Sequence, residues 1–385
     1  MPAASEKTPL YRRLVERIRA NGPITFAQYM EACLYDPEFG YYARGGNRRR
    51  ADYYTSVDVS PLFGALLARQ LHEMWQILGR PPEFTIAEPG AGDAALARHV
   101  LDFVAARLPD FYAALRYHAI ESSPARRSLH APNLGPHFAA GIARSFDQFT
   151  EHIGAGCIFS NEFVDALPVH RVEMEGGKLR EIYVDVAGEE LVEGRKPIST
   201  PEIADYFAEQ GIRLHENQQA EAGLAACQWI EDAGRRLQQG FILTIDYGRE
   251  ARELYDDRHM RGTALAYSRH RASEDFYRAP GEEDLTAHAN FTALDVWGRR
   301  AGLIRTGFTS QTNFLLALAR ANDFADVRPP EISTGFDTAA NDPAQIKSRL
   351  RFQSLIHPEG MGETFQVMAQ HIGIDQPRLT GFEPL

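Results

Sequence analysis

Short apolar runs alternate with amphipathic segments through the middle of the chain. The first run, residues 84–87, leads into a glycine turn and then into residues 94–101, whose apolar positions recur at helical spacing. Four later apolar runs are predicted to be strands as well, at 116–122, 141–146, 156–162 and 241–248. Strands that alternate with helices are typical of a parallel sheet with right-handed crossovers. The pattern therefore predicts an α/β fold built on a doubly wound sheet.

The first 80 residues show helical periodicity without a strand pattern. Their apolar positions predict three helices, the second of them capped by Thr25, at 10–19, 25–33 and 62–78. We expect residues 1–80 to form a helical cap that contributes to the cofactor and substrate site. Residues 81–385 are expected to form the core domain.

Residues 169–240 interrupt the alternation between the fourth and fifth predicted strands. They are predicted to contain a glycine-turn hairpin at 171–179, a further strand at 181–186, and helices at 201–210 and 220–239. We interpret this segment as an α+β insertion that shapes a substrate pocket.

The end of the chain follows a long polar and aromatic stretch, residues 249–290. Helices are predicted at 291–301 and 313–321. The strands predicted at 303–308 and 363–371 are suited to an antiparallel pair that closes the sheet.

Composition and charge describe an ordinary globular protein and disfavour several classes. Of the 385 residues, 44% are hydrophobic and 24% are charged. The formal net charge of −11 argues against a generic nucleic-acid-binding protein. Cys33, Cys157 and Cys227 lie far apart and form no CxxC pair, which suits a reducing compartment. No apolar run is long enough to span a membrane, and we expect a cytoplasmic protein.

The glycine turn after the first strand is the main candidate for a cofactor site. Gly90-x-Gly92 at a strand-to-helix turn places backbone N–H groups and a helix N-terminus at the edge of the sheet. Glu88 and Asp93 flank the turn, and no Lys or Arg lies at positions 84–97, so a diphosphate such as that of NAD would be repelled. A cationic ligand such as S-adenosyl-L-methionine suits these charges. A glycine turn without a ligand is the alternative.

Two acidic residues follow the next two predicted strands. Glu121 ends the second strand, where an acid in a doubly wound fold holds the ribose hydroxyls of a nucleotide. Asp147 follows the third strand and could accept a hydrogen bond from an adenine amino group, although it could equally cap a helix.

Two carboxylates and an amide follow the fourth strand, which lies beside the first in this topology. The end of that strand therefore faces the methyl group to be transferred. Methyl transfer requires a positioned nucleophile and a group that accepts its proton. Asn161, Glu162 and Asp165 could grip a guanidinium or an amine and accept that proton. N-capping of a following helix by Asn161 or Asp165 is the alternative.

The polar stretch after the fifth strand contains one further candidate. Asp284-x-Thr286-x-His288 has alternating spacing, which would place three polar side chains on one face of a strand. We take His288 as a candidate catalytic residue, although a lone histidine is more often structural. The number of ligands is too small for a metal site, and we predict none.

At these residues the sequence resembles the MidA-like family of class I methyltransferases, which includes the mitochondrial complex I assembly methyltransferase and bacterial relatives. The resemblance covers nearly the whole chain, and its most specific segments are Asn161-Glu162-x-x-Asp165 and Asp284-Leu285-Thr286-Ala287-His288. It implies a Rossmann-like, mostly parallel sheet with an antiparallel closing strand and S-adenosyl-L-methionine as cofactor. It also implies cofactor contacts from Thr55, Ser56 and Asn161. For the mitochondrial member it implies dimethylation of an arginine in a complex I subunit.

The chain departs from the family at two points. Ala94 stands where the family usually has a further glycine, and Ser56-Val57-Asp58 stands where Ser-Pro-Glu is common. We expect a methyltransferase that acts on a protein arginine. A small-molecule O- or N-methyltransferase and a non-catalytic assembly factor that still binds the cofactor are the alternatives. The acids around the glycine turn disfavour an NAD-linked oxidoreductase.

Overall fold

The computed structural model describes residues 7–43, 61–268, 271–323 and 364–384. The chain divides into two compact units, each assembled from three separate stretches. Unit 1 comprises Met1–Tyr53, Phe163–Asp232 and Gly248–Arg300, and unit 2 comprises Tyr54–Glu162, Ala233–Tyr247 and Ala301–Leu385.

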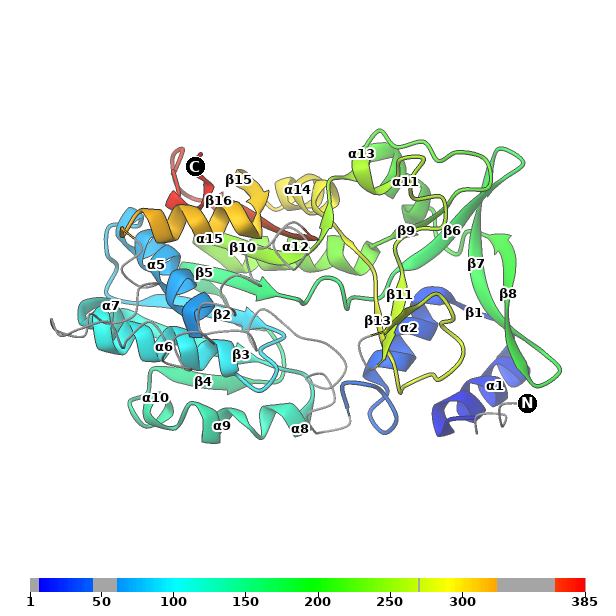
Figure 1. Cartoon of the computed structure of the whole chain (residues 1–385), viewed down its shortest axis with the longest axis horizontal. Coiled ribbons are helices and arrows are strands. Elements are labelled where there is room, and N and C mark those ends of the chain that lie inside the picture. Colours follow the sequence, from blue (N-terminus) through cyan, green and yellow to red (C-terminus); the bar gives the residue numbers. More distant parts are fainter. Residues whose placement is uncertain (1–6, 44–60, 269–270, 324–363, 385) are drawn as a thin grey trace, which may run out of the picture. The chain divides into compact units, whose positions relative to one another are not determined.

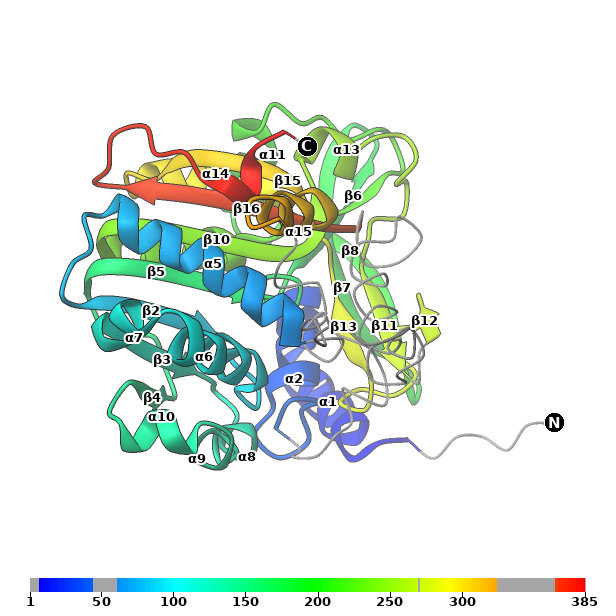
Figure 2. The same cartoon turned by 60° about the vertical axis from the view of Figure 1, so that its left-hand side comes forward.

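Unit 2 is built around a sheet whose strands run in the order β15-β16-β10-β5-β2-β3-β4 (Figures 1 and 2). Neighbouring strands from β10 to β4 are parallel, whereas β16 is antiparallel to both β10 and β15. The predicted doubly wound sheet with an antiparallel closing pair is confirmed. The strands are β2 (Phe84–Pro89), β3 (Leu115–Ile120), β4 (Ala143–Phe146), β5 (Ile153–Asn161), β10 (Leu237–Arg249), β15 (Ile304–Ser310) and β16 (Phe365–Ile372).

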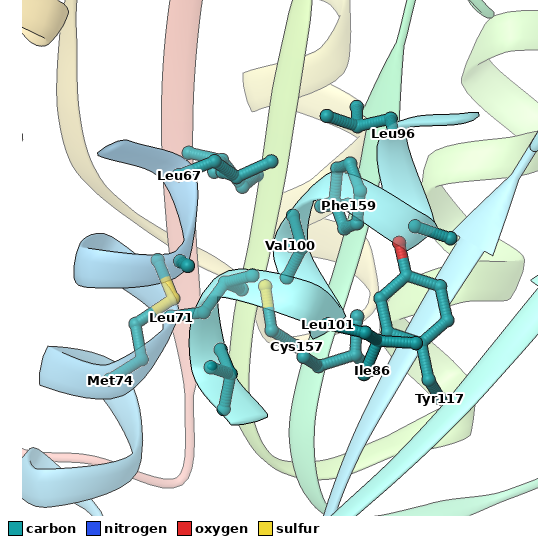
Figure 3. Packing of buried hydrophobic residues seen from close by; sticks show 14 of the residues in the cluster. Leu67, Leu71, Met74, Ile86, Leu96, Val100, Leu101, Tyr117, Cys157 and Phe159 are labelled. Atoms are coloured by element: carbon teal, nitrogen blue, oxygen red, sulfur yellow. The ribbon is translucent and has the colours of Figure 1, made fainter. Parts of the chain in front are cut away.

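Helices α5 (Pro61–Ile77) and α6 (Ala95–Arg107) cover one face of this sheet (Figure 2). Their apolar side chains meet those of the strands in one cluster, in which Leu71, Val100 and Phe159 are fully buried (Figure 3). Burying a side chain of this size stabilises the fold by about 1.5–3 kcal/mol. Gly64 lets α5 approach α6, because a Cβ at this position would lie 2.5 Å from the Cβ of His99. This packing fixes α6 and, with it, the loop that precedes the helix.

Shorter helices complete unit 2. Three of them follow β3 and lie along β4, at the edge of the sheet (Figures 1 and 2). These are α8 (Pro124–Arg127), α9 (His130–Asn133) and α10 (Gly135–Ala139). The others are α7 (Pro109–Ala114), α15 (Gln311–Arg320) and the 3-10 helix η2 (Thr380–Phe382).

Unit 1 contains two antiparallel sheets. In the larger, β1 (Ile24–Thr25), β7 (Lys178–Ala187), β6 (His170–Glu175) and β9 (Gln219–Ala222) pair in that order, and β8 (Glu190–Pro197) pairs with β7. In the smaller, β12 (Arg271–Ser273), β11 (Leu265–Ser268) and β13 (Asp284–Thr286) pair in that order. The remaining elements are α1 (Pro9–Asn21), α2 (Phe26–Tyr35), α11 (Glu202–Glu209), α12 (Leu224–Arg236), α13 (Ala251–Leu254), β14 (Ala289–Asn290) and α14 (Phe291–Arg300).

The predicted N-cap of the second helix is confirmed. The Thr25 hydroxyl accepts a hydrogen bond from the Gln28 N–H at 3.2 Å, and the Gln28 side chain accepts one from the Thr25 N–H at 3.1 Å. This reciprocal capping box satisfies N–H groups that a helix start otherwise leaves unpaired. Among the described residues, no helix combines the length and the apolar character that crossing a membrane requires.

Two local predictions within residues 169–240 are wrong in part. Residues 181–186 are not a separate strand, because they continue the second arm of the hairpin as β7. Residues 220–222 belong to strand β9, and the helix begins only at Leu224. Alanine and glutamate favour helices, but here Ala220 and Ala222 are buried in the sheet, so tertiary packing overrides propensity. The polar stretch 249–290 contains strands β11 to β14, of which the sequence analysis suggested only the one at Asp284–Thr286.

Candidate functional site

The loop between β2 and α6 turns through three left-handed residues. Gly90 has φ 72°, Gly92 has φ 60° and Ala94 has φ 63°. Glycine adopts this conformation freely, whereas a residue with a Cβ pays roughly 1–2 kcal/mol. Ala94 therefore adopts a backbone conformation that favours glycine, which is the usual residue at this position in the family that the sequence resembles. A Cβ built on Gly92 would meet no atom within 4 Å, so the space beside this residue is open.

Glu121 lies directly against this loop. One carboxylate oxygen accepts the Gly92 N–H at 3.0 Å and the other accepts the Ser123 N–H at 2.8 Å. The side chain is 6% exposed. The sequence predicts that Glu121 and Gly92 share one site, and the structure brings them together because parallel strands end at the same edge of the sheet.

Glu88, the second acid at this edge, is buried at the end of β2. The Tyr117 hydroxyl donates to its carboxylate at 2.7 Å. Burial, with the nearby charges of Asp93 and Glu121, raises the pKa of Glu88 to about 8. The carboxyl is therefore mostly protonated at neutral pH when no cation is present. A bound cation would favour its charged form, so this environment fits a positively charged ligand.

The loop fits S-adenosyl-L-methionine better than a diphosphate-containing nucleotide. Positions 84–97 carry two acids, Glu88 and Asp93, and no Lys or Arg that could pair with phosphate. Backbone N–H groups alone would have to offset the repulsion of a diphosphate by these carboxylates. A ligand with a sulfonium and an ammonium avoids that cost.

The end of β5 places the next two candidates. β5 ends at Asn161, and Glu162 follows with φ 52° and donates its N–H to the Ile245 carbonyl at 3.0 Å. The Asn161 amide donates to the Glu162 carboxylate at 3.1 Å, and both side chains are buried. No helix begins in residues 162–169, so the alternative capping role of Asn161 or Asp165 is not found.

The other predicted cofactor contacts differ in their surroundings. Asp147 follows β4 and is exposed, and no helix begins in residues 147–152, so it caps none. Its expected contact with an adenine amino group stays a prediction. Thr55 and Ser56 lie outside the described residues.

Two buried carboxylates lie close to tyrosines in unit 1. Asp284 accepts a hydrogen bond from the Tyr42 hydroxyl at 2.8 Å, and it lies opposite Tyr267 in the pairing of β13 with β11. Burial and the charge of Asp165 raise the pKa of Tyr267. The Asp165 carbonyl accepts the Ala287 N–H at 3.0 Å, which ties the segment of Asp165 to that of Asp284. Carboxylates beside aromatic rings suit a guanidinium.

His288 lies two residues beyond β13, so the expected single strand face of Asp284, Thr286 and His288 does not form. Its N–H donates to the Thr263 hydroxyl at 3.1 Å. Burial, with the charges of Arg249 and His259, lowers the pKa of His288 to about 4. The ring is neutral at physiological pH and is a weak proton acceptor. Within the ranges that the structure describes, no three His, Cys, Asp or Glu side chains gather as a metal site.

Three polar side chains contact the glycine loop or Glu88 in ways that the sequence does not predict. Tyr117 reaches Glu88 from the neighbouring strand, where its own partner in the pairing is Ile86. His130 and Asn133, at the two ends of the four-residue helix α9, contact backbone carbonyls of the loop. A four-residue helix is too short to show a periodic pattern of apolar residues in the sequence. Every residue has a backbone carbonyl, so the sequence does not indicate which carbonyls His130 and Asn133 contact.

Comparisons with known proteins agree on one family. A family model of S-adenosyl-L-methionine-dependent methyltransferases matches residues 66–309. The mitochondrial protein arginine methyltransferase NDUFAF7 of mouse is 28% identical, covering 96% of this chain and 86% of the relative. The Drosophila melanogaster homolog is 27% identical, covering 92% and 87%. The crystal structure of a Burkholderia thailandensis protein bound to S-adenosyl-homocysteine matches with a TM-score of 0.85 and 30% identity, covering 97% of this chain and 94% of that one.

The cytoplasmic location expected from the sequence is wrong by these comparisons. The relatives from fruit fly, mouse and human are all named as mitochondrial proteins. The expectation relied partly on three separated cysteines, which fit any reducing compartment and do not distinguish one from another.

Proposed function

Because the chain belongs to the family of S-adenosyl-L-methionine-dependent methyltransferases that its sequence resembles, we propose that it methylates the guanidinium of a protein arginine. S-adenosyl-L-methionine is its cofactor. The observation that carries the choice of acceptor is the pair of buried carboxylates in unit 1, Asp165 and Asp284, beside Tyr267 and Tyr42. The names of the mouse and fruit fly relatives, which are protein arginine methyltransferases, support the same acceptor.

The glycine loop and the acids beside it hold the cofactor in this proposal. Gly90, Gly92 and Glu88 bind the methionine end, where the Glu88 carboxylate meets positive charge. Glu121 accepts hydrogen bonds from the ribose through the lone pairs that its two backbone contacts leave available. The sequence alone adds Asp147, Asn161, Thr55 and Ser56 to the proposed cofactor contacts.

On sequence grounds, the carboxylates of Glu162 and Asp165 act on the acceptor. A guanidinium is charged at all physiological pH values, so it needs carboxylates to orient it and to remove a proton. When bound, the cofactor supplies the methyl group. A guanidinium nitrogen gains the methyl carbon as the carbon–sulfur bond breaks, and the proton of that nitrogen passes to Asp165 or Glu162. The methylated arginine stays cationic, and Asn161 holds the Glu162 carboxylate in place.

We also propose that the acceptor is a subunit of a complex I-type respiratory assembly. This follows the resemblance to the mitochondrial member of the family. Because Asp165 and Asp284 are buried, we expect the arginine to lie on an accessible loop or terminus of that subunit.

A transfer experiment tests the acceptor. The purified full chain is incubated with methyl-labelled S-adenosyl-L-methionine and mitochondrial lysate, and the labelled species are hydrolysed and analysed by mass spectrometry. Label in methylated arginine supports the proposal. Label confined to small molecules would contradict the protein acceptor and leave the methyltransferase assignment standing. Cofactor binding without transfer to any molecule would favour a non-catalytic assembly factor.

Replacing Glu121 should weaken cofactor binding. Glu121→Ala removes the ribose acceptor and frees the Gly92 N–H, and charged hydrogen bonds of this kind typically change Kd by about tenfold or more. Calorimetry with S-adenosyl-L-methionine measures the effect. Glu83→Ala is the matched control, since Glu83 is an exposed acid just before β2 whose carboxylate lies 3.4 Å from the Arg116 guanidinium. Equal affinity in wild type and Glu121→Ala would remove the ribose assignment.

A further inference from the structure

We propose that His130 and Asn133 of helix α9 are positioning residues for the cofactor. They hold the carbonyl oxygens of the glycine loop, so that the N–H groups of the loop and the Glu121 carboxylate stay in the geometry that binds it. The inference rests on the proposed cofactor role of Gly92 and Glu121, and it assigns a task to residues that make no direct cofactor contact.

His130 binds the loop through a defined tautomer. Its Nε2 lies 2.9 Å from the Gly92 carbonyl oxygen and its Nδ1 lies 2.8 Å from the Ser145 hydroxyl. A carbonyl oxygen only accepts, so Nε2 carries the proton, and in a neutral ring Nδ1 accepts from Ser145. The side chain is completely buried, and burial lowers the pKa of His130, which keeps the ring neutral.

Asn133 holds the next carbonyl of the loop. Its amide donates to the Asp93 carbonyl oxygen at 2.6 Å. Two successive carbonyls, those of Gly92 and Asp93, are thereby directed towards α9. Since both donors belong to one four-residue helix, they act on the loop together.

Gly92 is consequently held at both of its peptide groups. Its N–H donates to Glu121 at 3.0 Å, and its carbonyl accepts from His130 at 2.9 Å. A glycine in an open turn otherwise loses more backbone freedom than any other residue when a ligand orders it. Because the two contacts order Gly92 in advance, the cofactor does not bear that entropy loss on binding, and its affinity rises.

His137 provides a matched comparison. It is also buried, at 4% exposure, and lies in the neighbouring helix α10. Its ring bonds run from Nδ1 to the Tyr112 hydroxyl at 2.7 Å and from Nε2 to Asp102 at 3.0 Å. A substitution of His137 therefore disturbs the same region without touching the glycine loop.

The test compares His130→Leu, His130→Gln and His137→Leu in the full chain. We expect His130→Leu to raise the Kd for S-adenosyl-L-methionine about tenfold with kcat at saturating cofactor nearly unchanged. Gln can place a donor near the position of Nε2, so His130→Gln should recover most of the affinity. His137→Leu should lower the melting temperature and leave Kd as in wild type.

Two further variants keep the outcome decisive. If His130→Leu fails to fold, Asn133→Ala, at a partly exposed position, should still raise Kd about threefold. In the double variant His130→Leu/Glu121→Ala, the two losses should be less than additive, because both act through Gly92.

Two results would overturn the inference. One is a wild-type Kd in the His130 and Asn133 variants while Glu121→Ala weakens binding. The other is a loss in His130→Leu that Gln does not recover and that His137→Leu reproduces. Wild-type affinity in Glu121→Ala as well would instead contradict the proposed cofactor site itself.

Discussion

Asp165→Asn should lower kcat about a hundredfold or more while changing the Kd for S-adenosyl-L-methionine by no more than about twofold. Asparagine keeps the size of the side chain but loses the charge that orients a guanidinium and accepts its proton. The Asp165 side chain is only 4% exposed. Its charge is the second cause, after burial, of the raised pKa of Tyr267, so this charge acts in a partly desolvated environment. Initial rates of S-adenosyl-homocysteine formation with lysate proteins, together with calorimetry, measure both quantities.

Asp295→Asn is the matched control for this substitution. Asp295 is also a buried aspartate of unit 1, in α14, and it pairs with Arg299 at 2.5 Å. The control should keep a normal kcat. A near-normal kcat in Asp165→Asn, or an equal loss in both variants, would contradict the assignment of Asp165 to the acceptor.

The affinity for S-adenosyl-L-methionine should rise on the order of fiftyfold between pH 6 and pH 8. Burial raises the pKa of Glu88 to about 8, so the carboxyl holds its proton through most of this range. A cationic ligand binds the carboxylate better than the neutral acid, and binding is therefore coupled to loss of the proton. Calorimetry across this pH range, in buffers of different ionisation enthalpy, measures the affinity and the proton release together.

The variant Glu88→Gln separates the pH dependence that comes from Glu88 from the pH dependence that comes from titration of the ligand. The amino group of the cofactor itself titrates near pH 8, and that contribution persists in the variant, whereas the Glu88 contribution disappears. The raised pKa also means that the ligand-free fold favours the protonated acid. Its stability should therefore fall relative to Glu88→Gln as the pH rises towards about 8. Identical pH profiles in the two proteins would contradict a role for Glu88 in cofactor binding.

The meeting of Glu121 and Gly92 at one edge of the sheet could be predicted because it follows from local sequence patterns. Apolar runs mark β2 and β3, and parallel strands must end at the same edge, which brings Glu121 to Gly92. The charges of Glu88 and Asp93 then indicate the sign of the ligand. These inferences need only strand order and electrostatics.

The contacts that hold this edge together could not be predicted in the same way. His130 lies 38 positions beyond Gly92 and meets only its backbone carbonyl, an acceptor that every residue has. Strand β9 was mistaken for helix because Ala220-Glu221-Ala222 has helical propensity. Its strand form comes from pairing with β6, and the Glu221 carboxylate accepts the Thr263 N–H at 2.9 Å and the Ala264 N–H at 3.2 Å. Such long-range contacts exist only after folding.

Glu88, the buried acid at the end of β2, also has a consequence for the release of the product after each turnover. In the proposed site, S-adenosyl-homocysteine, which has lost the sulfonium charge, would gain less than the methyl donor from an ionised Glu88. As the medium becomes more acidic, the neutral carboxyl should discriminate less between the two. We then expect product inhibition to be strongest in acid and relieved in alkali, so that turnover follows the proton concentration of the surrounding compartment.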